Sequence, residues 1–230
     1  LLGLSALMFI TGLIADMLAR IRINQERMLY LLKNGNSPSP VAPVSQEPIR
    51  PNERFLVFGS PEIGQEEIAE VEAVLRSGWL GTGPRVAQFE NEFAEYIGAN
   101  HVAAVNSCTA ALHLSLLAAR IQPGDEVITT PLTFCATVNA IIHAGCTPVL
   151  ADIDPQTMNI DIDQVRDKLT DKTRAIVPVH FAGRPCNMDA IMSLANDRDL
   201  RVIEDCAHAI ETEYRGRKAG TFGDFGCFSF

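Results

Sequence analysis

Two acids followed by a histidine form the most chemically suggestive group in this sequence. A strand predicted over 201–204 ends in Glu204, Asp205 follows directly, and His208 comes three residues after Asp205. Buried carboxylates are costly unless a cation or a hydrogen-bond donor meets them. An aspartate at a strand end can hold a protonated ring nitrogen through a charge-assisted hydrogen bond, and His208 can then reach a phenolate-type oxygen. The residues alone leave open that Asp205 caps a helix and that His208 faces solvent or lies satisfied in the core.

A second group of residues could bind an anion and an aromatic ring. After residues 101–105, Asn106 or Ser107 can cap a helix whose first N–H groups face outward, and such a helix start binds phosphate. Plain capping without a ligand is the alternative. Phe134, which follows the next predicted strand, could stack on a planar heterocycle or belong to the core. His180, at a further strand end, could touch the ligand or fix its own loop.

These side chains need a scaffold that brings distant residues together, and the rest of the sequence predicts one. Short β-branched runs alternate with helical stretches, which is typical of an α/β fold with a mostly parallel sheet flanked by helices. Ligands gather at the carboxyl ends of strands in such sheets. We expect helices at 65–76, 87–97, 109–120, 135–144, 162–169 and 188–196. We expect strands at 101–105, 126–130, 147–152, 174–179, 201–204 and 226–230.

Composition and charge narrow the class of protein. The chain has 230 residues, 47% of them hydrophobic, with 19 Lys and Arg against 28 Asp and Glu. Six of the basic and four of the acidic residues fall in 1–54, which leaves 13 against 24, a net charge of −11, on 55–230. This excess of negative charge argues against nucleic acid as the main partner. The six cysteines form no C-x-x-C pair, and we expect reduced, mostly buried thiols.

The first 54 residues differ in pattern from the rest. Residues 1–15 are uncharged and arginines follow them, which favours a truncated transmembrane helix with its cytoplasmic exit over 1–32, although a buried or interfacial helix is an alternative. Residues 33–54 contain five prolines and no hydrophobic periodicity, so we expect a linker there. The enzyme-like body should then occupy 55–230.

Several stretches of this body together resemble the DegT/DnrJ/EryC1/StrS sugar aminotransferase family. They include GWLGTGPRVAQFENEFAEYIGA, NSCTAALHLSLLA, PGDEVITTPLTFCATVNAI, VHFAGRPCNMDAI, EDCAHAIETEYRGRKAG and FGDFGCFSF. The resemblance implies the large domain of a fold-type-I enzyme that depends on pyridoxal 5′-phosphate. It also implies transfer of an amino group from an amino acid such as glutamate to a keto-sugar nucleotide, in the synthesis of cell-surface polysaccharide, lipid A or related amino sugars.

The same resemblance implies roles for individual residues. Asp205 matches the partner of the pyridinium nitrogen, and His208 its neighbour near the ring hydroxyl. Phe134 matches the aromatic residue on the ring face. The phosphate contacts would come from Thr109, Ala110 and Ser229. No metal site is expected.

Further implications concern the rest of the protein. Residues 78–84 match a segment that shapes the sugar-nucleotide site together with a second subunit, so we expect a homodimer. The lysine that anchors the cofactor in the family should follow Phe230 by about four residues, so we expect the fragment alone to be inactive. Glu211 stands where many members have glycine.

Two rival functions stay open, and both depend on residues outside the resemblance. One is a dehydratase of the same fold in which histidine replaces the lysine. The other is a non-catalytic relative anchored to the membrane by residues 1–22, a stretch that resembles the last transmembrane helix of polyprenyl-phosphate glycosyltransferases. In either case, as for the aminotransferase, we expect the folded body in the cytoplasm, tethered to the inner membrane.

Overall fold

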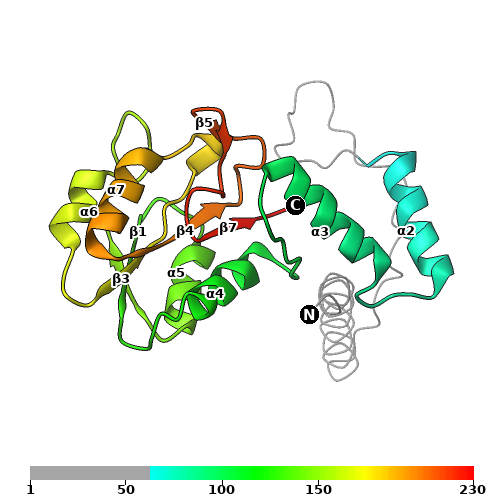
Figure 1. The fold of residues 1–230 in the computed structure, drawn as a ribbon, viewed down its shortest axis with the longest axis horizontal. Coiled ribbons are helices and arrows are strands. Elements are labelled where there is room, and N and C mark those ends of the chain that lie inside the picture. Colours follow the sequence, from blue (N-terminus) through cyan, green and yellow to red (C-terminus); the bar gives the residue numbers. More distant parts are fainter. Residues whose placement is uncertain (1–62) are drawn as a thin grey trace, which may run out of the picture.

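A single parallel sheet organises the described part of the protein. The computed structural model describes residues 63–230, so the predicted membrane segment at 1–32 and the linker at 33–54 lie outside the described residues. The main sheet has the order β2-β1-β3-β4-β7, and every neighbouring pair in it is parallel (Figure 1). Its strands are β1 (Glu126–Thr129), β2 (Thr147–Leu150), β3 (Thr173–Ile176), β4 (Arg201–Cys206) and β7 (Phe225–Phe228). The predicted parallel α/β fold is confirmed.

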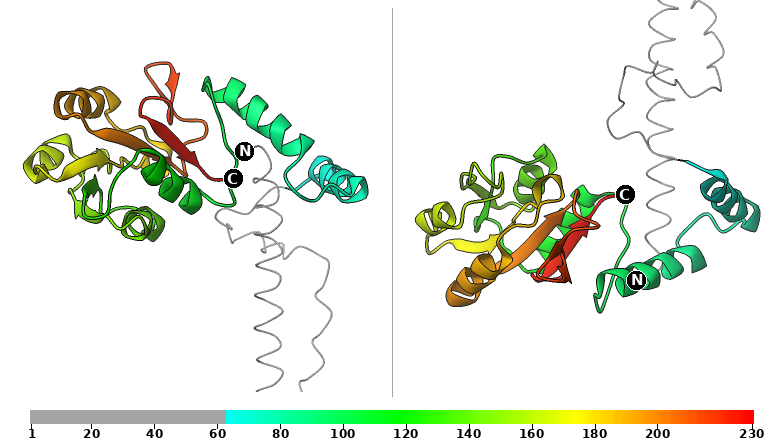
Figure 2. Two further views of the ribbon diagram at one scale, coloured as in Figure 1. Left: turned by 60° about the horizontal axis from the view of Figure 1, so that its bottom comes forward. Right: turned by 90° about the horizontal axis from the view of Figure 1, so that it is seen from above.

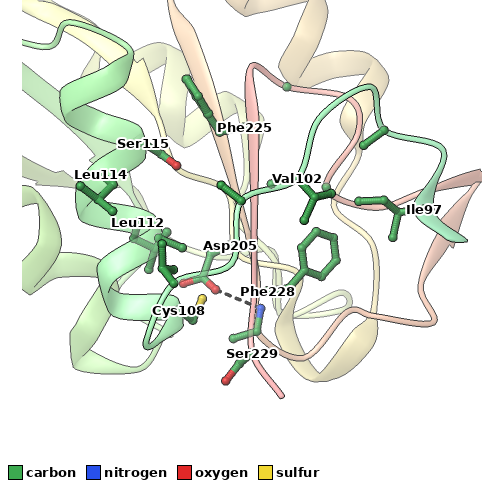
Figure 3. Close-up of a pocket in the computed structure, with 18 of the residues that line it drawn as sticks. Ile97, Val102, Cys108, Leu112, Leu114, Ser115, Asp205, Phe225, Phe228 and Ser229 are labelled. Carbon is green, nitrogen blue, oxygen red and sulfur yellow. Dashed lines mark hydrogen bonds between the residues drawn. The ribbon is translucent and has the colours of Figure 1, made fainter. Parts of the chain in front are cut away.

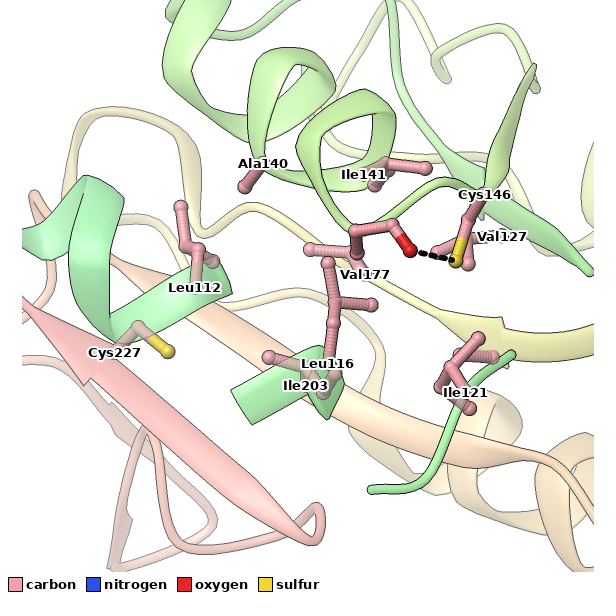
Figure 4. Close-up of a cluster of buried hydrophobic side chains, with 12 residues drawn as sticks. Leu112, Leu116, Ile121, Val127, Ala140, Ile141, Cys146, Val177, Ile203 and Cys227 are labelled. Atoms are coloured by element: carbon pink, nitrogen blue, oxygen red, sulfur yellow. Dashed lines mark hydrogen bonds between the residues drawn. The ribbon is translucent and has the colours of Figure 1, made fainter. Parts of the chain in front are cut away.

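Helices cover both faces of this sheet because successive strand residues point to opposite sides (Figure 2). Val127, Val177 and Ile203 face α4 (Cys108–Ala118) and α5 (Cys135–His143) and form one buried cluster with them (Figure 4). The opposite face buries a second cluster against α6 (Ile162–Lys168) and α7 (Met188–Arg198), in which Ile128, Ile176 and Val202 take part. Apolar burial holds both helix layers against the sheet, and the candidate polar site residues lie at the strand ends.

Two further helices lie beside the sheet and its covering helices (Figure 1). They are α2 (Gln65–Ser77) and α3 (Pro84–Ile97), and each ends at a glycine in the left-handed conformation. The ring of Phe93 on α3 packs edge-on against Phe228 of β7, with ring centroids 5.1 Å apart. No residue of α2 is buried within the part of the chain that the structure describes. The aromatic contact therefore joins α3 to the edge of the sheet.

One sequence prediction is wrong, and one element was not predicted. The strand predicted at 101–105 is wrong, because this segment forms no ladder with any other strand between residues 63 and 230. A short antiparallel hairpin, β5 (Glu213–Tyr214) and β6 (Arg217–Lys218), was not predicted because strands of two residues carry no readable alternation. A single turn of 3₁₀ helix, η1 (Phe181–Gly183), follows β3. In residues 63–230, no helix has the length and apolar character that a membrane crossing requires.

Candidate functional site

A large cavity within residues 63–230 opens where β4 and β7 end. Its volume is about 1440 Å³, and its walls come from the start of α4, the turn before α5, the residues after β4 and β7, and the 97–105 segment (Figure 3). Five of the six residues that the sequence proposed as site residues line it. They are Thr109, Phe134, Asp205, His208 and Ser229. Residues that are up to 120 positions apart therefore meet at one strand edge, as parallel topology requires.

The start of α4 supplies backbone donors to this cavity. Ser107 is the N-cap, and its hydroxyl oxygen accepts a hydrogen bond from the backbone N–H of Ala110 at 3.1 Å. The N–H groups of Cys108 and Thr109, at the first two helical positions, have no acceptor within the helix. Ala110 itself is not among the lining residues, and its N–H is already used in the cap. Thr109 and Cys108 are therefore better placed to meet an anion than Ala110.

Asp205 is nearly buried at the floor of the cavity, with 5% of its surface exposed. One carboxylate oxygen accepts the hydroxyl of Thr137 at 2.7 Å, and the other accepts the backbone N–H of Ala207 at 3.2 Å. Thr137 is in turn 2.7 Å from the hydroxyl of Thr133. Each carboxylate oxygen can accept more than one donor. Asp205 therefore still has room for a cationic N–H from a ligand.

The remaining predicted residues lie around Asp205 and are open to solvent. Phe134 is the N-cap of α5, and 77% of its surface is exposed, so the core alternative for this ring is wrong. His208 is exposed in the turn after β4, and Ser229 is exposed directly after β7. An exposed aromatic ring in the same cavity as a buried carboxylate provides a surface for a flat, positively charged heterocycle.

Glu204 lies on the opposite side of β4 from Asp205 and is fully buried. It accepts backbone N–H groups from Gly220, Phe222 and Gly223 at 2.7–2.8 Å, and it is 3.0 Å from the Nε2 atom of His180. The Nδ1 atom of His180 accepts the backbone N–H of Cys186 at 3.0 Å, so Nε2 carries the proton and the ring is neutral. His180 thus fixes its loop, and the sequence alternative of ligand contact is not supported.

A metal ion has no free ligands at this buried group. Side-chain atoms of His180, Glu204 and Cys206 lie within 4.8 Å of one another, which is close enough for shared coordination. Both ring nitrogens of His180 are already hydrogen-bonded, and Glu204 has four donors. Burial, followed by the charge of Glu204, raises the pKa of the Cys206 thiol well above its usual value. His180 and Glu204 therefore form a hydrogen-bonded structural pair, and Cys206 lies buried beside them.

The cysteines behave as the sequence predicted. All six are free, and four of them are buried: Cys146, Cys186, Cys206 and Cys227. Burial is the main cause that raises the pKa of Cys186 and of Cys227 to about 12, and it also raises the pKa of Cys108 beside the cavity. Thiols held in the protonated form are poor nucleophiles. None of these three is therefore a candidate nucleophile.

Thr133, Thr137 and Glu204 are the residues near the site to which sequence reasoning gave no role. Thr137 contacts Asp205 across 68 positions of sequence, and Glu204 contacts backbone groups 16 to 19 positions away. The only sequence signal was that Glu204 stands beside Asp205 at the end of an apolar run. Alternation along a strand places two adjacent acids on opposite faces, which already implies two different roles.

Comparison with known proteins agrees with this geometry. Residues 61–230 match the DegT/DnrJ/EryC1/StrS aminotransferase family. The spore coat polysaccharide biosynthesis protein SpsC of Bacillus subtilis is 54% identical over 182 residues, which are 79% of this chain and 47% of SpsC. An aminotransferase of Psychrobacter cryohalolentis is 45% identical with a TM-score of 0.72, and the match covers 74% of this chain and 44% of that one.

A third relative has been solved with cofactor. The Streptococcus pneumoniae protein Spr1654, in its pyridoxal phosphate (PLP) and pyridoxamine phosphate (PMP) forms, is 36% identical with a TM-score of 0.73, and the match covers 76% of this chain and 48% of that one. This chain therefore spans about half the length of the relatives that it matches. With its matching sequence, sheet order and strand-end cavity, the chain belongs to the DegT/DnrJ/EryC1/StrS aminotransferase family.

Proposed function

We propose that this chain is the cofactor-binding part of an aminotransferase that moves an amino group from an amino acid to a keto-sugar nucleotide. The observation that carries the proposal is the cavity in which Asp205, Phe134 and Thr109 come together. The relatives support the class of reaction, and the name of SpsC supports a product used in a surface polysaccharide. Glutamate is the amino donor that we propose, as the family resemblance implies.

The residues around the cavity fit pyridoxal phosphate on chemical grounds. The cofactor has a ring nitrogen that becomes cationic, a flat apolar face and a phosphate. Asp205 offers a buried carboxylate with acceptor capacity left, and Phe134 offers an exposed ring. The first N–H groups of α4 and the hydroxyls of Thr109 and Ser229 offer donors for the phosphate. His208 would lie near the ring hydroxyl.

The chemistry of the bound cofactor is to accept the electron pair of a breaking C–H bond into its ring. The residues of this chain would keep the ring able to accept those electrons and would orient it. Asp205 would keep the ring nitrogen protonated, because a carboxylate in a largely buried site stabilises a neighbouring cation. Phe134 would fix the plane of the ring, and the start of α4 would fix its phosphate end. The proton carrier and nucleophile would be the lysine that the resemblance implies about four residues after Phe230.

The test is a half-reaction with the protein made from the longest reading frame that contains this chain. Addition of pyridoxal phosphate should change the visible absorbance, and glutamate should then yield one equivalent of 2-oxoglutarate per active site. A lysine at the expected position after Phe230 supports the aminotransferase, whereas a histidine there favours the dehydratase. The absence of any absorbance change would contradict both enzymes and favour the non-catalytic relative.

We also propose that the protein acts as a homodimer tethered to the inner membrane, with its folded body in the cytoplasm. Exposed apolar residues at 68, 71, 75 and 79 on and after α2 give a surface for a second subunit. Light scattering that gives the mass of one subunit would contradict the dimer.

The uncharged residues 1–15 with arginines after them support the tether. Recovery of the protein from cells without detergent would contradict the tether.

A further inference from the structure

Asp205 is held by a short chain of hydroxyl groups that begins at the cavity wall. Thr137 is 1% exposed and lies 2.7 Å from a carboxylate oxygen of Asp205. An ionised carboxylate only accepts hydrogen bonds, so the hydroxyl proton of Thr137 must point to Asp205. The oxygen of Thr137 is then the acceptor for Thr133, whose hydroxyl is 2.7 Å away. The proton direction along the chain is therefore fixed from Thr133 to Thr137 to Asp205.

The segment that carries these hydroxyls also carries the aromatic ring of the site. Thr133 and Phe134 immediately precede α5, and Thr137 lies in its first turn. The backbone N–H of Thr137 donates to the carbonyl of Phe134 at 3.1 Å, which closes this turn. One rigid turn therefore sets both the position of the Phe134 ring and the orientation of the Asp205 carboxylate.

We infer that Thr137 is a positioning residue for Asp205, oriented by Thr133, and that the 133–137 turn aligns the ring-face contact and the ring-nitrogen contact of the cofactor as one unit. The inference rests on the proposed function, because it concerns how the same site holds its ring. Hydrogen-bonded chains strengthen each member by polarisation, and bonds to charged groups are the strong ones. Loss of the Thr137 hydroxyl should leave Asp205 free to turn away from the ring nitrogen.

A purely structural role of Thr137 would have different effects from a positioning role, and the chain offers a control that separates the two. Thr129 in β1 is also fully buried, and its hydroxyl donates to the backbone carbonyl of Val177 at 2.8 Å. Replacement of Thr129 by valine removes one buried hydroxyl donor without touching Asp205. Thr137→Val and Thr129→Val therefore share the general cost of an unpaired buried acceptor. Only Thr137→Val should change the affinity of the site for a ligand that has a ring nitrogen.

The experiment compares two ligands in the full-length protein. Pyridoxamine 5′-phosphate forms no covalent bond with a lysine, and its 1-deaza analogue has carbon in place of the ring nitrogen. Thr137→Val should weaken binding of pyridoxamine phosphate by about tenfold, the effect of one charge-assisted hydrogen bond, and should leave binding of the analogue unchanged. Thr137→Ser, which keeps the hydroxyl, should restore the wild-type preference. Thr129→Val should not alter the ratio of the two dissociation constants.

The outcomes separate this inference from the proposed function. If Asp205→Asn abolishes the preference for pyridoxamine phosphate while Thr137→Val retains it, the positioning role is wrong and the cofactor site stands. If the wild type and Asp205→Asn bind both ligands equally, Asp205 does not meet a ring nitrogen and the proposed function fails. Thermal unfolding of each variant shows whether it is folded at the temperature of the titration. If Thr137→Val is unfolded there, the Thr133→Val variant takes its place, with the same direction of change expected.

Discussion

Glu204 and Asp205 are adjacent on β4 and have opposite surroundings. Glu204 points away from the cavity and has four donors, three of them backbone N–H groups of the turn at 220–223. Asp205 faces the cavity and has two donors from the protein. The first acid is saturated by its own chain, whereas the second still has acceptor capacity. The number of protein donors around a buried acid thus distinguishes an acid that holds the fold from one that is ready to meet a ligand.

The largest expected effect is on turnover, from Asp205→Asn. Asparagine keeps the shape of the side chain and can still accept the N–H of Ala207, but it has no charge to hold a cationic ring nitrogen. We expect the half-reaction with glutamate to slow by at least about a hundredfold, the size of effect that loss of one key electrostatic contact has in other enzymes. The midpoint of thermal unfolding should change little. If the variant has a much lower midpoint of thermal unfolding but keeps its turnover, Asp205 supports the fold as Glu204 does, and the difference between the two acids is contradicted.

Glu204→Gln should show the opposite pattern. The amide nitrogen would face either donors of the 220–223 turn or the Nε2–H of His180, and His180 cannot change tautomer because its Nδ1 atom accepts from Cys186. We expect the free energy of unfolding to fall by about 4 kcal/mol, as for other broken buried charge networks. Urea denaturation followed by circular dichroism measures this loss. A loss below about 1 kcal/mol would mean that Glu204 is not the centre of the turn.

A smaller effect should come from the close packing of the 220–223 turn on β7. A Cβ atom at Gly226 would lie far inside van der Waals contact with the backbone of Gly220, so backbone atoms would have to move. We expect Gly226→Ala to cost about 2–3 kcal/mol of unfolding free energy. Gly216→Ala is the control, because Gly216 has positive φ but nothing within 4 Å of a new Cβ. Its cost should be only about 1 kcal/mol, from the left-handed backbone. Equal losses would contradict the close packing.

The smallest effect should come from an acid on the surface. Glu72 pairs with Arg76 one turn along α2, and both side chains are more than half exposed. Exposed pairs of this kind contribute little because water and salt screen them. We expect Glu72→Gln to change the free energy of unfolding by less than about 0.5 kcal/mol. A loss comparable to that of Glu204→Gln would show that the count of donors does not separate the two classes of acid.

Most of the fold could be predicted from the sequence, because the burial of one face of each helix and strand sets the spacing of its apolar residues. The strands at 126–130, 147–152, 174–179 and 201–204 have counterparts in β1 to β4, with ends that differ by a few residues. The stretch at 101–105 has the same β-branched character, yet no ladder forms there. Apolar alternation describes how a strand packs and says nothing of which neighbour completes its hydrogen bonds. Pairing is a property of the whole sheet, so the sequence of one segment cannot settle it.

The site likewise contains residues that could be predicted from the sequence and residues that could not. Asp205, His208, Phe134 and Thr109 could be proposed because each follows a predicted strand or opens a predicted helix, whereas Ser229 was proposed from the resemblance alone; all five line the cavity. Ala110 was proposed from the resemblance, but its N–H belongs to the cap made by Ser107. Thr137 could not be found, because a threonine in the first turn of a helix looks like any other until its partner 68 positions away is known. Contacts of this range depend on tertiary structure.

The way in which Glu204 holds the 220–223 turn has a consequence for how this segment tolerates sequence drift. Three of its four donors are main-chain groups, which every residue except proline possesses. Thr221 contributes no donor to Glu204, and Phe222 contributes only its N–H. Glu204 therefore constrains the backbone shape at these two positions and not their side chains. Thr221 lines the cavity, so the wall can change its chemical character at that position while the support that Glu204 gives to the turn stays in place.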